Sequence, residues 1–248
     1  MKILVCISHV PDTTSKINFT DNNAKFDSNG VQYVINPYDE FALTRAMWFK
    51  EKQGATVTVA TVGNATTEPT LRKALAIGAD DAIRVNTEAL DGFTVAKELA
   101  NVVKNGGYDL VLAGKESIDY NGGMVPAILA TLLDFNFVNA CIGLEIDGEK
   151  ATISREIDGG KEQLSANLPL IIAGQKGLVE EKDLRIPNMR GIMMARQKPL
   201  TIVESSNGNA TTAIVSFEKQ AAKSACKLVD ADNVGELINL LHNEAKVI

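Results

Sequence analysis

The chain has 248 residues, of which 31 are acidic and 25 are basic, so its formal net charge is −6. Apolar residues make up 45% and charged residues 23%, the balance of a soluble globular protein with a sizeable core, which excludes intrinsic disorder as the main state. The acidic balance, without a lysine and arginine run, also excludes nucleic acid as a partner, because that affinity depends on neutralising phosphates.

Targeting signals and cysteines place the chain in a cell compartment. No apolar run approaches the roughly 18 to 20 residues that cross a bilayer, and the first ten residues, MKILVCISHV, turn polar too soon for a secretory signal. Cys6, Cys141 and Cys226 are odd in number and far apart, which argues against a disulfide framework and against a zinc site. We therefore expect a cytoplasmic protein in a reducing environment.

The first two thirds of the chain alternate apolar strands with amphipathic stretches, which predicts an α/β fold. We expect a doubly wound, mostly parallel sheet of the Rossmann-like, nucleotide-binding kind. The predicted buried strands are rich in Val, Ile and Leu and lie at residues 2–7, 56–62, 81–85 and 109–113. The predicted helices lie at residues 37–53, 67–77, 91–104 and 123–133.

The helix beginning at Pro37 has a clear opening signal. Asn36 is expected to cap it, Pro37 suits the first helical position, and Asp39 and Glu40 favour its positive end. Ahead of it, Asn29 and Gly30 predict a turn between two short extended runs, and hence a small hairpin or excursion before the helix.

After Phe135 the pattern of apolar and polar residues changes. Alternating residues separated by Asp-Gly turns predict a short antiparallel addition at 142–146, 151–157 and 163–167, followed by an apolar strand at 168–173. Residues 178–216 have little periodicity and predict an extended arm, which leads to a last helix at 232–243. The predicted domains are an α/β domain over 1–177 and a C-terminal arm over 178–248.

The sequence lacks the usual catalytic patterns. Its two histidines, His9 and His242, lie at opposite ends, and no cluster has metal-ligand spacing. The nucleophile elbow G-x-S-x-G, the P-loop and the G-x-G-x-x-G fingerprint are all missing. We therefore predict no catalytic residues, no metal site and no enzyme, and we interpret His9 as a loop histidine.

Four strand-to-helix turns are suited to a phosphate-bearing ligand, because backbone N–H groups and a helix dipole attract anions. They lie at residues 8–14, 36–39, 62–67 and 114–125. In the last turn, Gly122 and Gly123 let the backbone approach a ligand, while Asp119 and Asn121 can bond hydroxyls or cap the next helix. From the residues alone, a plain glycine-rich turn remains the alternative.

Six segments, in this order, resemble one known family over nearly the full length of the chain: the beta (small) subunit of electron transfer flavoprotein. The segments are ILVCISHVPD, GVQYVINPYDEFAL, ALAIGAD, DLVLAGKESID, REIDGGKEQLSANLP and RIPNMRGIMMARQKP. The order and spacing of all six, rather than any one of them, carry the resemblance.

The resemblance implies an electron carrier rather than an enzyme. Such a carrier accepts electrons from acyl-CoA dehydrogenases and other flavin dehydrogenases, as in fatty acid β-oxidation, and passes them to a membrane quinone oxidoreductase. It implies a heterodimer in which the alpha subunit holds most of the redox FAD, while the beta subunit holds a structural AMP.

The family motifs also imply site residues. The implied AMP site comprises Cys6, Asn36, Pro37, Tyr38, Asp39, Val62, Asp119, Tyr120, Asn121, Gly122, Gly123, Met124, Val125, Pro126, Ala127, Ile128, Leu129 and Ala130. A loop of Pro11, Asp12 and Thr13 would face the flavin of the alpha subunit. Partner recognition would involve Met189, Arg190 and Ile192, with Met189 as an apolar anchor where the family commonly has leucine. The arm and its terminal helix would pack on the alpha subunit.

Two alternatives stay open. HVPDTT and NPYD also resemble members that split electron pairs and hold a second FAD in place of AMP, whereas REIDGG resembles the carriers that hold AMP. A stand-alone nucleotide-sensing α/β module is the other alternative, because the glycine-bearing turns alone would fit it.

Overall fold

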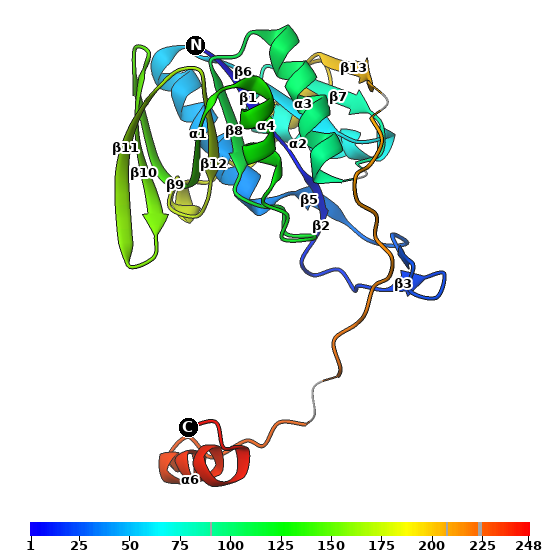
Figure 1. Ribbon diagram of the computed structural model, residues 1–248, viewed down its shortest axis with the longest axis vertical. Helices are drawn as coiled ribbons and strands as arrows, with labels where there is room; N and C mark the ends of the chain where they lie inside the picture. Colours follow the sequence, from blue (N-terminus) through cyan, green and yellow to red (C-terminus); the bar gives the residue numbers. More distant parts are fainter. Residues whose placement is uncertain (90, 207, 223–224) are drawn as a thin grey trace.

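A computed structural model describes residues 1–89, 91–206, 208–222 and 225–248. Its main feature is a nine-stranded sheet (Figure 1). The strands are β1 (Lys2–Cys6), β6 (Thr56–Val62), β7 (Asp81–Asn86), β8 (Leu110–Gly114), β9 (Asn136–Asp147), β10 (Lys150–Ile157), β11 (Gly160–Asn167), β12 (Leu170–Gly174) and β13 (Leu200–Glu204). Their order is β11-β10-β9-β12-β8-β1-β6-β7-β13.

The predicted fold class is confirmed. In the spatial order β9-β12-β8-β1-β6-β7-β13, every neighbouring pair of strands is parallel. Beyond β9, the strands β10 and β11 extend the sheet in antiparallel pairing. Strand β9 begins earlier than expected, at Asn136: its first residues pair in parallel with β12, and its later residues pair with β10 in the antiparallel addition.

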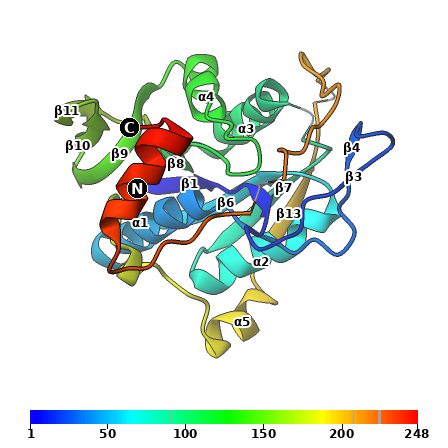
Figure 2. The ribbon, with the colours of Figure 1, turned by 90° about the horizontal axis from the view of Figure 1, so that it is seen from below.

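Four long helices cover the two faces of the sheet (Figure 2). They are α1 (Pro37–Gln53), α2 (Glu68–Ile77), α3 (Gly92–Gly106) and α4 (Val125–Leu133), with a short 3-10 turn η1 (Ala65–Thr67) before α2. Alternation along β1 explains the two layers: Ile3 and Val5 pack with α1 and α2, whereas Leu4 and Cys6 pack with α3 and α4.

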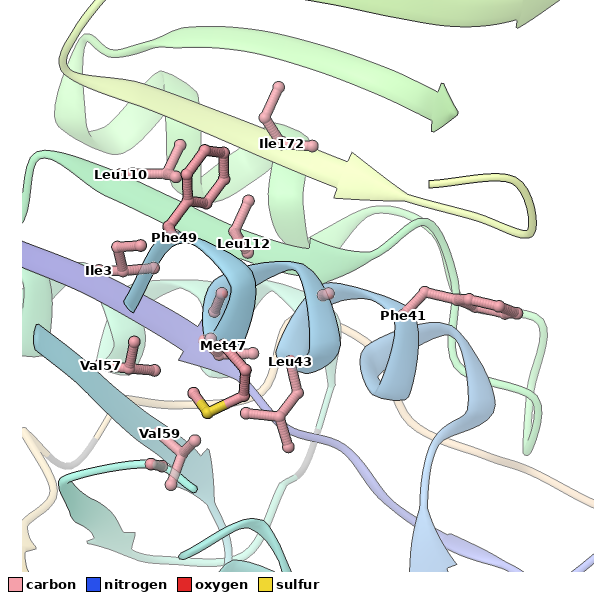
Figure 3. Close-up of a cluster of buried hydrophobic side chains, with 14 of the residues drawn as sticks. Ile3, Phe41, Leu43, Met47, Phe49, Val57, Val59, Leu110, Leu112 and Ile172 are labelled. Carbon is pink, nitrogen blue, oxygen red and sulfur yellow. The ribbon is translucent and has the colours of Figure 1, made fainter. Parts of the chain in front are cut away.

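Helix α1 is the best-buried helix and fixes the geometry of the candidate site. Figure 3 shows Leu43, Met47 and Phe49 of α1 against Ile3 and Leu112 of the central strands. Fully burying one such side chain stabilises a fold by about 1.5–3 kcal/mol. This packing holds the first turn of α1 at the carboxyl ends of the strands.

An excursion between β1 and α1 is confirmed, but its pairing differs from the expected one. Its strands are β2 (His9–Pro11), β3 (Phe19–Thr20), β4 (Lys25–Phe26) and β5 (Tyr33–Ile35). The hairpin joins β3 to β4 through Asp21, Asn22 and Asn23, which adopt left-handed backbone angles that Asp and Asn tolerate. Gly30 also forms a turn, with φ of 72°, but the strand after it, β5, pairs with β2.

The segment expected to open the arm belongs partly to the main body. After a 3-10 turn η2 (Glu181–Asp183), helix α5 (Met189–Ala195) packs against α2, and β13 pairs in parallel with β7 at the sheet edge. The sequence Leu200–Glu204 is apolar and β-branched enough to extend an open sheet edge, but its partner lies more than a hundred residues away. The extended path therefore begins after Glu204 rather than at Leu178.

The C-terminal elements lie far from the sheet. Helix α6 (Val234–Asn239) continues as a π-helical turn, η3 (Leu240–Ala245), at the lower end of Figure 1. A search of the described residues finds no helix with the length and apolar character that crossing a membrane requires.

Candidate functional site

The candidate site lies where the sheet changes direction. β6 and β8 flank β1 on opposite sides, so the chain reverses its order of strands between β1 and β8. Open α/β sheets bind ligands in the crevice outside the carboxyl ends of the strands at this point. The turns after β1 and β8, and the first turn of α1, meet there.

Asp39 connects the ends of these two strands. The backbone amides of Ser8 and Gly114 each donate to its carboxylate at 2.7 Å. Burial raises the pKa of the Asp39 carboxyl to about 7, although these two amides oppose the rise. The carboxylate therefore links the exit of β1 to the exit of β8 from the first turn of α1.

Asn36 does not cap α1 as expected. Its buried side chain donates from Nδ2 to the Glu116 carbonyl at 2.9 Å and accepts at Oδ1 from the Ile118 amide at 3.3 Å. Asn36 stands at the predicted N-cap position, but its side chain does not cap the helix, because the loop after β8 takes up both polar atoms of the amide. Asn36 thereby holds the glycine-bearing loop in place.

The loop at residues 115–124 brings the exposed predicted residues together. The Ser117 amide donates to the Gly122 carbonyl at 3.1 Å, and Asn121 adopts a left-handed φ of 51°. A Cβ at Gly123 would lie 3.0 Å from the Lys115 carbonyl oxygen, so a larger residue would force this part of the loop to shift. Asp119, Tyr120, Asn121, Gly122, Gly123 and Met124 are all exposed along this loop.

The loop leads directly into the N-terminus of α4. Within the described part of the chain, Met124 at the N-cap supplies no side-chain cap. Pro126 has no N–H, so the first turn offers the amides of Val125 and Ala127 to an anion, which the helix dipole also favours. Further along α4, Val125, Ala127 and Ile128 are half-buried, whereas Pro126, Leu129 and Ala130 are buried, the last two in the core beside α3.

The remaining predicted nucleotide residues surround the same edge. Cys6 and Val62 end β1 and β6 and both pack in the layer of α3 and α4. Burial, with a smaller effect of Asp39, raises the pKa of the Cys6 thiol to about 12. The thiol is therefore uncharged at neutral pH and contributes a packing surface rather than a charge. Pro37 is exposed, and the half-buried Tyr38 lies beneath Lys115, whose Nζ is 5.4 Å from the ring centre.

The predicted flavin-facing loop begins in the small sheet before α1. Pro11 ends β2, the Asp12 carboxylate accepts from the Thr14 amide at 2.8 Å, and Thr13 is exposed. Sequence reasoning missed the aromatic pair next to it: the rings of His9 and Tyr33 stack with centres 4.2 Å apart. Only the pairing of β2 with β5 brings them together, and no local signal in the sequence marks it.

His9 has a defined environment. Its Nδ1 lies 2.8 Å from the Thr70 hydroxyl of α2, and desolvation lowers the pKa of its imidazole. A neutral ring, stacked on Tyr33 and bonded to Thr70, stiffens the start of the loop.

The predicted recognition residues lie on a separate surface formed by α5. Met189 and Arg190 open the helix and are exposed, and Ile192 is 42% exposed. Between α2 and α5 runs a groove of about 590 Å³, lined by Pro69, Arg72, Lys73, Ala76, Pro187, Ile192, Ala195 and Arg196. Both an apolar surface and cationic side chains are available to a partner here.

Two cationic residues attach this surface to α2. Arg72 Nη1 donates to the carbonyls of Ala195 and Lys198 at 2.8 and 2.9 Å. Lys198 Nζ in turn donates to the Leu75 and Ala79 carbonyls at the end of α2, at 2.9 and 2.5 Å. The surface formed by α5 therefore packs on the α/β domain and does not belong to a free arm.

The fold defines a doubly wound α/β protein in which the turns after β1 and β8 meet at the switch point of the sheet. Among known proteins, the electron transfer flavoprotein domain family matches residues 24–207. The electron transfer flavoprotein subunit beta of Bacillus subtilis is 36% identical over the full length of both chains. The subunit beta of Syntrophomonas wolfei is 35% identical over this whole chain and 98% of its own length. The subunit beta of Dictyostelium discoideum is 32% identical over 96% of this chain and 97% of its own length. The chain belongs to the electron transfer flavoprotein subunit beta family, a family of electron carriers rather than catalytic enzymes.

Proposed function

We propose that this chain is the beta subunit of a heterodimeric electron carrier and holds a structural AMP at the carboxyl ends of β1 and β8. The observation that carries the proposal is the tight loop with Gly122 and Gly123 leading into an α4 N-terminus whose amides are open to a phosphate. When bound, AMP supplies no redox chemistry. The redox FAD is proposed to sit mainly on the alpha subunit, facing the loop of Pro11, Asp12 and Thr13.

The C-terminal helix supports a second chain as partner. Val234, Leu237 and Ile238 of α6 are exposed, and the helix lies away from the sheet (Figure 1). An apolar helix face in water favours association with another surface. We propose that the alpha subunit covers this helix and the extended segment before it.

The α5 surface supports docking of an electron donor. Residues 184–200 carry four cations, Arg185, Arg190, Arg196 and Lys198, and no carboxylate, in a chain whose net charge is −6. Arg185 pairs with Glu51 and Lys198 bonds α2, whereas neither Arg190 nor Arg196 forms an ion pair within the part of the chain that the structure describes. A flavin dehydrogenase such as an acyl-CoA dehydrogenase, with an apolar pocket and an acidic rim, is the proposed donor. A membrane quinone oxidoreductase is the proposed acceptor.

Chromatography of the nucleotides released by denaturing the purified heterodimer tests this proposal. One AMP and one FAD per heterodimer are expected. Two FAD molecules would instead identify the electron-splitting alternative, in which FAD replaces AMP. A chain that stays monomeric and free of nucleotide beside its alpha subunit would contradict the proposal.

Replacing Gly123 with valine gives a matched test of the crevice. The new side chain would crowd the Lys115 carbonyl, so the heterodimer should retain less AMP. Gly160→Val in β11 is the control, because no described heavy atom lies within 4 Å of a Cβ there and β11 is outside the proposed AMP site and interface. Equal AMP content in both variants would place the nucleotide elsewhere.

A further inference from the structure

Helix α5 concentrates exposed sulfur. Three of the six methionines of the chain, Met189, Met193 and Met194, lie within six residues, and their exposed fractions are 76%, 69% and 51%. Met47 in α1, by contrast, is 4% exposed. Methionine is an apolar residue that is usually buried, so this cluster is an unusual surface.

The fold itself turns these side chains outward. Gly191 lies so close to the Ala76 carbonyl of α2 that any Cβ would overlap it, and Ala195 is buried against the same side. Met189 and Met193 are four residues apart and therefore share one face of the helix. Asn188 caps the helix, with its Oδ1 accepting from the Gly191 amide at 2.7 Å. Helix α5 packs beside α2 (Figure 2), and it holds the exposed thioethers at the surface.

We propose that Met189, Met193 and Met194 form a reversible oxidation site that controls docking of the electron donor to α5. The proposal rests on the proposed function of α5 as the docking surface. The oxidant is hydrogen peroxide, which forms when a reduced flavin meets dioxygen. Docking alone requires only that these three side chains are apolar. The proposal adds a covalent modification of their sulfur atoms.

The chemistry is a two-electron oxidation of sulfur. A thioether lone pair attacks one peroxide oxygen, the O–O bond breaks, and an S–O bond forms. The departing hydroxide takes the proton of the transferred oxygen and leaves as water, so the products are methionine sulfoxide and water. Methionine sulfoxide reductases reverse the step with thiol reductants, which become a disulfide as water is released.

Oxidation changes the surface from apolar to polar. A sulfoxide oxygen is a hydrogen-bond acceptor, and burying it in an apolar pocket without a donor is unfavourable. Electron uptake from the dehydrogenase should therefore slow. Met124 at the start of α4 is also 55% exposed, so the experiment has to separate its oxidation from that of the α5 cluster.

The test uses the purified heterodimer treated with dilute hydrogen peroxide. Peptide mass spectrometry should find sulfoxide at all three α5 methionines and little at Met47. Electron uptake from the reduced dehydrogenase should slow at least ten-fold, about 1.4 kcal/mol of lost transition-state stabilisation. Methionine sulfoxide reductase with a thiol should restore the rate.

Two variants, each compared with its own untreated rate, locate the effect. The triple variant Met189→Leu, Met193→Leu and Met194→Leu should lose the peroxide sensitivity, whereas Met124→Leu should keep it. The proposal is overturned if fully oxidised α5 leaves uptake unchanged, or if the triple variant slows as much as the native heterodimer. Failure of the proposed function shows separately, as an untreated heterodimer that accepts no electrons, and it overturns this proposal as well.

Discussion

At the scale of single residues, the crevice depends on one buried carboxylate and one missing side chain. Asp39 accepts from the amides of Ser8 and Gly114, and this bond pattern is possible only because position 114 has no Cβ. A Cβ there would lie 2.5 Å from Asp39 Oδ1 and 2.6 Å from the Tyr38 Cβ. The glycine is thus required by close packing at the end of β8.

We expect Gly114→Ala to lower the free energy of unfolding by about 2–3 kcal/mol, because overpacking at a buried site forces neighbours to move. Urea denaturation of the purified chain measures the change. Gly160→Ala is the control: no described heavy atom lies within 4 Å of that position, so a change within about 0.5 kcal/mol is expected. Equal stabilities of the two variants would show that the β8 exit is not tightly packed.

The raised pKa of Asp39 predicts a pH dependence of stability. Because the folded carboxyl titrates near 7 and the unfolded one near its ordinary value of 3.8, the unfolded chain loses this proton first as pH rises. The contribution of Asp39 to stability should therefore fall between about pH 4 and 7, by up to about 4 kcal/mol, and stay constant above pH 7.

Asp39→Asn removes this titration. The difference in unfolding free energy between the native chain and the variant should therefore decrease across that window. Urea denaturation at several pH values and constant ionic strength measures it. A difference independent of pH would mean that Asp39 is already ionised at pH 4.

At the scale of elements, two carboxylates of α3 direct the start of the extended segment. Glu98 accepts from the Ser206 amide at 3.0 Å, and Asp91 Oδ2 accepts from the amides of Thr211 and Thr212 at 2.6 and 3.0 Å. The other oxygen of Asp91, Oδ1, accepts from the Thr94 amide at 2.8 Å and caps α3. Asp91 therefore serves two elements with two different atoms.

Asp91→Asn should separate these two roles. Asparagine retains one carbonyl oxygen and remains a good helix cap, but it has no second acceptor for Thr211 and Thr212. Limited proteolysis should cut the variant faster near residues 208–222, while its thermal unfolding changes little. Asp91→Ala, which also loses the cap, should lower stability by about 1 kcal/mol in addition. Unchanged cleavage in both variants would show that Asp91 does not hold the segment.

At the scale of the whole molecule, the chain consists of a packed body and a projecting C-terminal end. Among the described residues, Phe217 and Lys219 still contact the body: the Phe217 ring stacks on Phe19 with centres 4.7 Å apart, and Lys219 donates to Asn18 Oδ1 at 2.9 Å. Beyond them the chain runs to α6 at a distance from the sheet (Figure 1). Ordering such a segment costs conformational entropy that only a partner surface can offset.

Deletion of residues 220–248 should leave the body folded. We expect the melting temperature of the isolated chain to change by less than about 2 °C, because the deleted segment lies outside the core. Size-exclusion chromatography with the proposed alpha subunit should show loss of the heterodimer. A truncated chain that still assembles would contradict the proposed role of this segment.

The core strands were predictable because their signals are local. The buried strands β1, β6, β7 and β8 were placed within one residue at each end, since short runs of Val, Ile and Leu stand between clear turns. The start of α1 at Pro37 was also marked locally. By contrast, Asn36 offered an equally good local cap signal, and a loop eighty residues away took its side chain instead.

The sequence by itself determined the α/β class, the positions of the four parallel core strands, the positions of the glycine-bearing turns and the family. These properties depend on periodicity, turn residues and ordered motifs, which neighbouring residues specify. Only the tertiary structure decided that β13 closes the sheet edge, that Asp39 joins the exits of β1 and β8, and that α5 is mounted on α2 with its methionines outward. Those features depend on contacts between residues far apart in the chain, whose free energy appears only after the core has formed.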